Sequence, residues 1–324
     1  MKKLLTIAVP TFNRSAYLER LLAALADATV DLGDAVEIIV SDNASADETP
    51  DVLRRLAARL PGVRIVNNAV NIGAEANVQQ CFDLAVGEYV WIIGDDDMPK
   101  RGAIPAIVRT LAAEQPDIAY LPSEWVDDAI SPDQGALFDE SRYSMVDALT
   151  FGRRVNVFVT FLSGMIVKKS QDVADVPPMT TGSNLPQLGW ILPALKHGRS
   201  FLVFRDAPVV ATGGNSGGYA VIEVFGINLS AMVARVFGRG SPMHNAIIGR
   251  TVISYLPQLV LNIRTGSGGD FVANFPWQKL RREIGRYPGY WGFVVPVGKA
   301  PLPIARSVLL SARIVAKLGR MLRG

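Results

Sequence analysis

Three consecutive carboxylates, Asp95, Asp96 and Asp97, follow a short β-branched and aromatic segment at residues 89–93. The segment has the length and composition of one buried strand, and Gly94 ends it. Because adjacent like charges repel, three carboxylates at the mouth of a buried strand indicate a compensating cation. Hard oxygen ligands in this position suit Mg²⁺ or Mn²⁺ carrying a phosphate-bearing substrate. The alternative is an acidic, solvated turn, since Asp is common in turns.

The elements that would position this triplet alternate along the first 94 residues. Apolar, β-branched runs predict strands, and amphipathic runs between them predict helices. The strands are expected at 4–9, 36–40, 63–66 and 89–93, and the helices at 16–26, 47–60 and 74–85. Strand–helix alternation predicts an α/β, Rossmann-like fold with a mainly parallel sheet and helices on both faces. In such sheets ligands bind beyond the carboxyl ends of the strands.

Polar groups follow each of these four strands. They lie at residues 10–14, 41–45 and 67–73, and in the aspartate triplet. Each of the first three segments has an alternative role, because residues such as Asn13, Ser45 and Asn71 are also good helix caps. The two roles are compatible, since one loop can carry both a helix start and a ligand contact. Neither a glycine-rich dinucleotide motif nor a Walker loop is present, so we expect polar side chains and a metal to hold the nucleotide.

Composition excludes two classes of site. A single cysteine, Cys81, cannot form an intramolecular disulfide, and two histidines with one cysteine make a zinc site improbable. The first residues resemble the start of a signal peptide, but the apolar run ends at Pro10. We therefore predict that residues 4–9 form the first strand. No run approaches the ~20 apolar residues that span a bilayer.

Charge is unevenly distributed. Residues 279–324 carry ten Lys/Arg and one Glu, a net charge of +9, whereas residues 1–278 carry 23 Lys/Arg and 29 Asp/Glu, a net charge of −6. Residues 220–237 and 244–264 have apolar, helical patterns, and 304–322 interleave apolar with basic side chains. Basic residues with interfacial aromatics predict a helix that lies on a membrane surface. The alternative is a helix packed on the body of the protein with a solvated basic face.

No recognised nucleic-acid-binding module is present, so we expect no nucleic-acid partner.

Four motifs together resemble family 2 glycosyltransferases with the GT-A fold. They are Thr6-Ile-Ala-Val-Pro-Thr-Phe-Asn-Arg14, Ile38-Ile-Val-Ser-Asp-Asn-Ala-Ser45, Asn71-Ile-Gly73 and Trp91-Ile-Ile-Gly-Asp-Asp-Asp97. The match is ordered and correctly spaced over about the first hundred residues. The resemblance implies that a metal-assisted enzyme transfers sugar from a UDP-, CDP-, dTDP- or GDP-sugar with inversion by in-line displacement.

The resemblance also implies roles for individual residues. The nucleotide-sugar pocket would be lined by Pro10, Thr11, Asn13, Arg14, Asp42, Asn43, Asn71, Gly73 and Asn77. Asp42 would meet the base. In the family's Asp-x-Asp motif we place Asp95 toward the ribose and Asp96 with Asp97 toward Mg²⁺ or Mn²⁺.

Many family 2 enzymes have a carboxylate, the general base, near the start of a helix that falls here around residue 187. This chain has Gln187, which cannot take a proton. Gln187 would then orient the acceptor, with the base elsewhere (Glu124 is a candidate), or the step would need little base help. We expect Asn184, Trp190 and Trp125 near the acceptor, although a Trp that follows a strand is often part of the core.

The segments Leu162–Lys169 and Gly213–Ser216 resemble the abequosyltransferase-like branch, whose members add sugars to lipid-linked O-antigen or other surface-polysaccharide intermediates. We expect a GT-A catalytic domain at 1–219, with a nucleotide-sugar half at 1–98 and an acceptor half at 99–219. A helical, basic region at 220–324 would hold the enzyme peripherally on the cytoplasmic leaflet of the membrane. The alternatives are a nucleotidyltransferase and a non-catalytic, membrane-associated sugar-binding protein.

Overall fold

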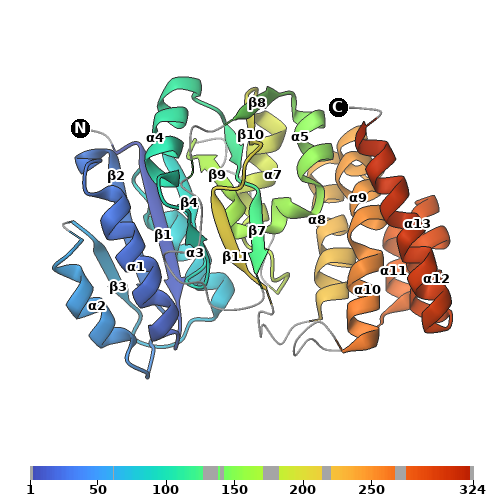
Figure 1. Ribbon diagram of the computed structural model, residues 1–324, viewed down its shortest axis with the longest axis horizontal. Helices are drawn as coiled ribbons and strands as arrows, with labels where there is room; N and C mark the ends of the chain where they lie inside the picture. Colours follow the sequence, from blue (N-terminus) through green and yellow to red (C-terminus); the bar gives the residue numbers. More distant parts are fainter. Residues whose placement is uncertain are drawn as a thin grey trace. The chain divides into compact units, whose positions relative to one another are not determined.

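The computed structural model describes residues 3–60, 62–126, 138, 142–170, 182–213, 220–266 and 275–321 (Figure 1). It divides into two compact units. The first comprises Met1–Ala148, Phe161–Gly182 and Pro186–Gly213, and the second comprises Leu149–Thr160, Ser183–Leu185 and Gly214–Gly324. The glycine-rich segment 214–218, part of the abequosyltransferase-like resemblance, lies outside the described residues.

Four parallel strands form one half of the main sheet in the first unit. They are β1 (Leu5–Thr11), β2 (Val36–Asp42), β3 (Arg64–Asn67) and β4 (Tyr89–Ile92). Their order is β3-β2-β1-β4, and every pairing among them is parallel. All four strands were predicted from the sequence, and their carboxyl ends meet at one edge of the sheet. The predicted gathering of polar loops at that edge is therefore confirmed.

The other half of the main sheet is mixed. Its strands are β6 (Ile118–Tyr120), β8 (Tyr143–Val146), β9 (Met165–Lys168) and β10 (Phe201–Phe204). β9 lies antiparallel between β4 and β6, and β8 lies antiparallel to β10. The α/β sheet flanked by helices is confirmed, and its antiparallel pairings all involve β8 or β9, whose directions a local apolar pattern does not reveal. A second, three-stranded sheet has the order β5 (Met98–Pro99), β11 (Val209–Thr212), β7 (Ser123–Val126).

Helices cover both faces of the main sheet, as predicted. The elements are α1 (Ser15–Thr29), α2 (Thr49–Ala57), α3 (Ala74–Leu84), α4 (Ala103–Glu114) and α7 (Leu188–His197). Side chains of α1, α2 and α4 share one apolar core with Leu5, Ile7 and Val9 of β1. On the other face α3 contacts β1, β2 and β4, and α7 contacts β6 and β9. Phe82 and Trp190 stack there with ring centroids 4.3 Å apart.

The second unit is helical, as predicted for the C-terminal region. Its elements are α5 (Ala148–Val155), η2 (Asn156–Thr160), η4 (Glu223–Asn228), α8 (Leu229–Phe237), α9 (Pro242–Ser254), α10 (Leu256–Thr265), α11 (Trp277–Ile284), η5 (Tyr290–Val294), α12 (Val295–Lys299) and α13 (Leu302–Met321). A buried histidine joins three parts of this unit. Nδ1 of His244 lies 2.6 Å from the Tyr287 hydroxyl, and Nε2 lies 3.3 Å from the Ser230 hydroxyl. Both ring nitrogens therefore have partners, as a fully buried imidazole requires.

One stretch of this unit is longer and more apolar than the sequence reading allowed. Pro242–Thr265 is long and apolar enough to cross a membrane by length and composition, and half of its most apolar window is buried within the protein. The stretch consists of α9 and α10, which meet at Tyr255. A buried helix of a soluble protein meets the same criterion, so the finding does not by itself place this stretch in a bilayer.

Candidate functional site

The carboxyl ends of β1 and β4 are joined through the aspartate triplet. The Thr11 hydroxyl donates to Asp95 Oδ2 at 2.8 Å. Arg14, in the loop before α1, donates from Nη1 to Asp95 Oδ1 at 3.0 Å and to Asp96 Oδ2 at 2.7 Å. The side chains of Asp95 and Asp96 are 6% and 13% exposed. The first strand's polar loop therefore supplies the cation that compensates the first two aspartates.

Asp97 has a different set of partners. The Ser163 hydroxyl accepts from the Gly94 N–H at 2.9 Å and donates to Asp97 Oδ2 at 2.5 Å. Asp97 Oδ1 accepts from the backbone N–H of Thr212 at 3.0 Å, and the Thr212 hydroxyl donates to the Asp96 carbonyl at 2.7 Å. Ser163 and Thr212 were not among the predicted site residues. Ser163 lies in a segment that the sequence marked only by resemblance, and its contact with the triplet depends on the antiparallel placement of β9.

One arginine cannot compensate three carboxylates, and burial makes their negative charge costly. Burial raises the pKa of Asp95 to about 6, although the nearby charge of Arg14 opposes that rise. Burial and the charge of Asp96 raise the pKa of Asp97 to about 7. Burial opposes the charged form of Arg14, but Asp95 and Asp96 outweigh it, and the pKa of Arg14 is raised above its ordinary value. The cluster is thus electrostatically suited to a further cation.

The loops that follow β1 and β2 bind each other. The backbone N–H of Asn13 donates to Ser45 Oγ, and Asn13 Oδ1 accepts from the N–H of Ala46, both at 2.8 Å. Asn13 has a φ of 52°, a left-handed conformation that Asn adopts more readily than most residues. Asp42 is 3% exposed and accepts from the N–H of Ser45 at 3.1 Å. Pro10 pairs with Ser41 in the parallel register of β1 and β2. These contacts fix both loops beside the triplet.

A network of amides organises the loop between β3 and α3. Asn43 Nδ2 donates to Asn71 Oδ1 at 2.8 Å, and Asn43 Oδ1 accepts from the N–H of Ile72 at 2.9 Å. Asn77 is 2% exposed, and both ends of its amide bind Ser41. Asn43 and Asn77 therefore support the loop from within. Asn71 is exposed, and Gly73 has a φ of 88°, which favours glycine at the start of α3.

The residues predicted for the acceptor side do not share one environment. Glu124 is 61% exposed and its carboxylate accepts from Lys100 at 2.8 Å, while Trp125 is 51% exposed and packs against Phe161. β11 links these two residues to the triplet, because it pairs with β7 and carries Thr212. Gln187 is 3% exposed at the start of α7.

Trp190 and Asn184 lie in other surroundings. Trp190 is 5% exposed and stacks on Phe82, so its indole belongs to the core between α3 and α7. Asn184 is exposed with a φ of 57°.

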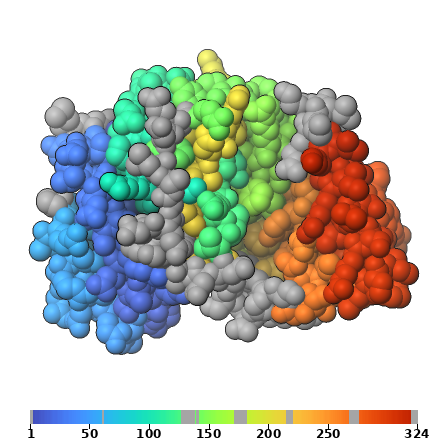
Figure 2. All heavy atoms as spheres, in the orientation of Figure 1, coloured from blue at the N-terminus to red at the C-terminus, as the bar shows by residue number. Residues whose placement is uncertain are grey.

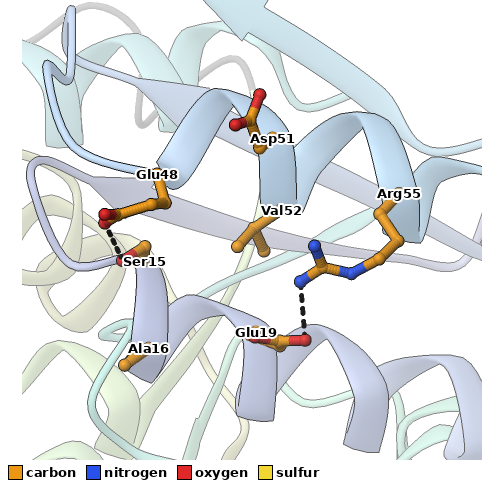
Figure 3. Close-up of a pocket in the computed structure, with 7 residues that line it drawn as sticks. All are labelled: Ser15, Ala16, Glu19, Glu48, Asp51, Val52 and Arg55. Carbon is orange, nitrogen blue, oxygen red and sulfur yellow. Dashed lines mark hydrogen bonds and ion pairs between the residues drawn. The ribbon is translucent and has the colours of Figure 1, made fainter.

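A hollow of about 370 Å³ lies between α1 and α2 (Figure 3). Ser15 and Glu48 approach each other at one side of it, and Arg55 binds Glu19 at 2.6 Å at the other. Its lining includes neither the aspartate triplet nor Asp42. We therefore assign this hollow to the packing of two surface helices.

The carboxylates of the triplet are donors of the kind that divalent cations prefer. A Cβ on Gly94 would lie 2.9 Å from Asp96 Oδ1 and 3.2 Å from Asp97 Oδ2, so carboxylate oxygens of both residues lie close to the same point beside Gly94. Among the described residues, no three His, Cys, Asp or Glu side chains form a metal site by themselves. Mg²⁺ is commonly held by one or two carboxylates together with substrate phosphates. The donor set is therefore right in kind, and it is incomplete without a phosphate-bearing ligand.

Comparison with known proteins gives results consistent with this geometry. A family model described as glycosyl transferase family 2 matches residues 6–170. The chain is 36% identical over 117 residues to abequosyltransferase RfbV of Salmonella typhimurium, covering 36% of this chain and 34% of that protein. It is 33% identical over 106 residues to GalNAc(5)-diNAcBac-PP-undecaprenol beta-1,3-glucosyltransferase of Campylobacter jejuni, covering 32% of this chain and 33% of that protein. The chain thus spans about a third of the length of these two relatives.

Two solved structures share the fold. S. aureus TarS 1-349 aligns with a TM-score of 0.59 and 15% identity over 99% of this chain and 92% of that chain. Mannosyltransferase PcManGT from Pyrobaculum calidifontis, in complex with GDP-Man and Mn²⁺, aligns with a TM-score of 0.52 and 16% identity over 97% of this chain and 87% of that chain.

Proposed function

The chain belongs to glycosyl transferase family 2, and from this premise we propose that it transfers a sugar from a nucleotide-sugar donor to a lipid-linked saccharide. The abequosyltransferase and the undecaprenol-linked glucosyltransferase among its relatives support this acceptor class and a role in surface-polysaccharide or O-antigen synthesis. The nucleotidyltransferase alternative is supported by no feature of the described residues beyond the shared α/β architecture. A non-catalytic sugar-binding protein has one feature in its favour, Gln187 at the position where many family 2 enzymes have their base, and donor hydrolysis without acceptor would argue against it.

One observation supports the proposal most directly. Arg14 binds Asp95 and Asp96 at 3.0 and 2.7 Å, which brings the end of β1 and the end of β4 into one buried, charged cluster. We propose that the nucleotide lies along this edge, with Asp42 toward the base and Asp95 toward the ribose. Pro10, Thr11 and Asn13 would form the wall nearest β1. Asn71 and Gly73 would border the sugar.

Asp96 and Asp97 would hold a divalent cation. When bound, Mg²⁺ or Mn²⁺ would neutralise the charge that develops on the departing diphosphate. Arg14 would add a charge-assisted hydrogen bond to the phosphate side of the donor. Ser163 and Thr212 would keep the carboxylate of Asp97 in a single orientation, because each of its oxygens already accepts one hydrogen bond. Pre-orientation of this kind reduces the reorganisation needed at the moment of reaction.

Glu124 is our candidate for deprotonating the acceptor hydroxyl. Its carboxylate is accessible, and β7 is tied through β11 to the residues around Asp97. The hydrogen bond from Lys100 lowers the pKa of Glu124 and makes it a weaker base in this state. We propose that Gln187 helps to orient the acceptor, since its amide cannot take the proton.

We propose a location on the cytoplasmic leaflet of the membrane, where lipid-linked acceptors and nucleotide sugars meet. The net charge of +9 on residues 279–324 supports contact with an anionic surface.

A thermal-shift screen of nucleoside diphosphates and nucleotide sugars, with and without Mn²⁺, tests the donor site. We expect one nucleoside diphosphate to raise the melting temperature only when Mn²⁺ is present. Asp96→Asn should abolish that shift, whereas Asp206→Asn, a change in an exposed ion pair with Arg142, should leave it intact. Product analysis should detect a nucleoside diphosphate. Release of pyrophosphate, or full activity in excess chelator, would contradict the proposal.

A further inference from the structure

The last helix of the chain, α13, packs on its unit through a narrow stripe of mostly small side chains. Ala305, Leu309, Ala312 and Ala316 are 0–7% exposed and recur at helical spacing. Through this stripe α13 contacts α9, α10 and α12. The stripe occupies one side of the helix, and much of the remaining circumference is exposed.

An apolar ridge lies on the opposite side of α13. Leu310, Ile314 and Leu318 are 59%, 52% and 52% exposed. They recur every four residues, and since each residue advances about 100° around the axis, Ile314 lies nearly opposite the buried stripe. Ile304 and Val315, 54% and 44% exposed, extend the apolar surface along one flank. Figure 2 shows the side chains of α13, in red, on the surface of the molecule.

A basic edge runs along the other flank of the ridge. Arg306, Arg313 and Lys317 are exposed and follow one another at spacings of seven and four residues. Arg313 donates to Gln258 Oε1 at 2.5 Å, which fixes its direction without neutralising its charge. Across the part of the chain that the structure describes, no acidic side chain forms an ion pair with any of the three. The sequence of α13 contains no Asp or Glu.

We infer that this ridge and its basic edge form the surface by which the protein docks on an anionic phospholipid bilayer. An exposed apolar ridge beside uncompensated positive charge matches a membrane surface, where acyl chains lie below a layer of phosphate groups. The helix would lie in the plane of the membrane with Leu310, Ile314 and Leu318 inserted. Arg306, Arg313 and Lys317 would meet the headgroups. The inference deepens the proposed membrane partner, and it depends on α13 alone rather than on the nucleotide site.

Vesicle co-sedimentation tests the docking surface on the full chain. The probes are vesicles of phosphatidylcholine with phosphatidylglycerol at 3:1 and vesicles of phosphatidylcholine alone. We expect strong binding to the anionic vesicles and much weaker binding to the neutral ones. Replacing Arg306, Arg313 and Lys317 together with Gln should weaken binding to the anionic vesicles on the order of a hundredfold, since each basic group contributes about fivefold. It should change binding to the neutral vesicles little.

A second variant tests the apolar ridge. Replacing Leu310, Ile314 and Leu318 with Gln should reduce binding to both kinds of vesicle at least about tenfold. The matched control replaces Arg54, Arg59 and Lys196, three exposed basic residues on α2, beside α2 and on α7, with Gln. Circular dichroism and the melting temperature of each variant show that it is folded.

Three results would overturn the inference. The first is wild-type protein that does not bind anionic vesicles, and the second is a control variant that loses as much binding as the α13 variants. The third is a wild-type dimer that Ile314→Gln dissociates, because the ridge would then be covered by a second copy. Donor binding, measured by thermal shift on the same variants, separates this inference from the proposed function. Lost vesicle binding with intact donor binding supports α13 docking, whereas absent donor binding in the wild type counts only against the donor site.

Discussion

Replacing Arg14 with Gln should destabilise the protein in a manner that depends on pH and on metal. Arg14 compensates Asp95 and Asp96 at 3.0 and 2.7 Å, and the side chains of the two aspartates are 6% and 13% exposed. Gln keeps a similar length and a hydrogen-bond donor but removes the charge. The variant therefore tests charge compensation rather than the size of the side chain.

The magnitude follows from burial and protonation. Breaking a fully buried ion pair costs about 3–5 kcal/mol. The Arg14 side chain is 29% exposed, so we expect a smaller loss, about 2 kcal/mol at pH 8. At pH 5 the loss should shrink to about 1 kcal/mol or less. The reason is that this pH lies below the pKa values of about 6 for Asp95 and about 7 for Asp97, so the cluster has already lost much of its charge.

Urea denaturation of the wild type, Arg14→Gln and Arg14→Lys at pH 5 and pH 8 measures these losses. The Lys variant keeps the charge and should retain most of the stability at pH 8. MnCl₂ without nucleotide should stabilise the Gln variant more than the wild type, because the ion replaces the missing positive charge. An equal loss at both pH values would refute the reasoning. It would show that Arg14 acts through packing, for example on the Tyr17 ring 5.5 Å away.

Three further predictions concern the same site. Ser163→Ala should cost about 1–3 kcal/mol of unfolding free energy and weaken Mn²⁺-dependent donor binding, because the buried carboxylate of Asp97 loses its 2.5 Å donor. Calorimetric melting measures the first effect and calorimetric titration the second, with Ser311→Ala, on an exposed face of α13, as the control. The wild type without metal should lose stability as pH rises from about 4 to about 7 and then level off, because the folded-state pKa values of Asp95 and Asp97 lie above the ~3.9 of an unfolded Asp. Mn²⁺ should flatten that profile, and a metal-free profile that rises over this range would count against the buried, charged triplet. Glu124→Gln should lower kcat by about 10²–10⁴-fold if Glu124 is the base, with Mn²⁺-dependent nucleotide binding unchanged; a kcat within twofold of the wild type would remove Glu124 from that role.

Local pattern was sufficient for the first half of the fold and for the edge at which the site lies. β1, β2 and β4 bury continuous apolar runs and the helices between the strands bury apolar stripes, so periodicity identifies them, while β3 is half-buried and its Ile65 packs against the same core. The rule that parallel strands present their carboxyl ends at one edge then brought Thr11, Asp42 and the aspartates to the same place. The basic character of the C-terminal helix could also be predicted from the sequence, because counting charged residues requires no coordinates.

Tertiary structure alone decided which of the predicted side chains are exposed at the edge of the sheet and which are buried. The family resemblance implied that Asn77 lines the nucleotide-sugar pocket, and we expected Trp190 near the acceptor, but both side chains are buried, and that burial depends on how α3 and α7 pack on the sheet. Ser163 and Thr212 reach Asp97 from positions 66 and 115 residues farther along the chain. A contact over such a separation leaves no local pattern in the sequence. The sequence by itself therefore determined the chemistry at the end of β4, and the antiparallel insertion of β9 with the pairing of β11 determined which groups hold it in place.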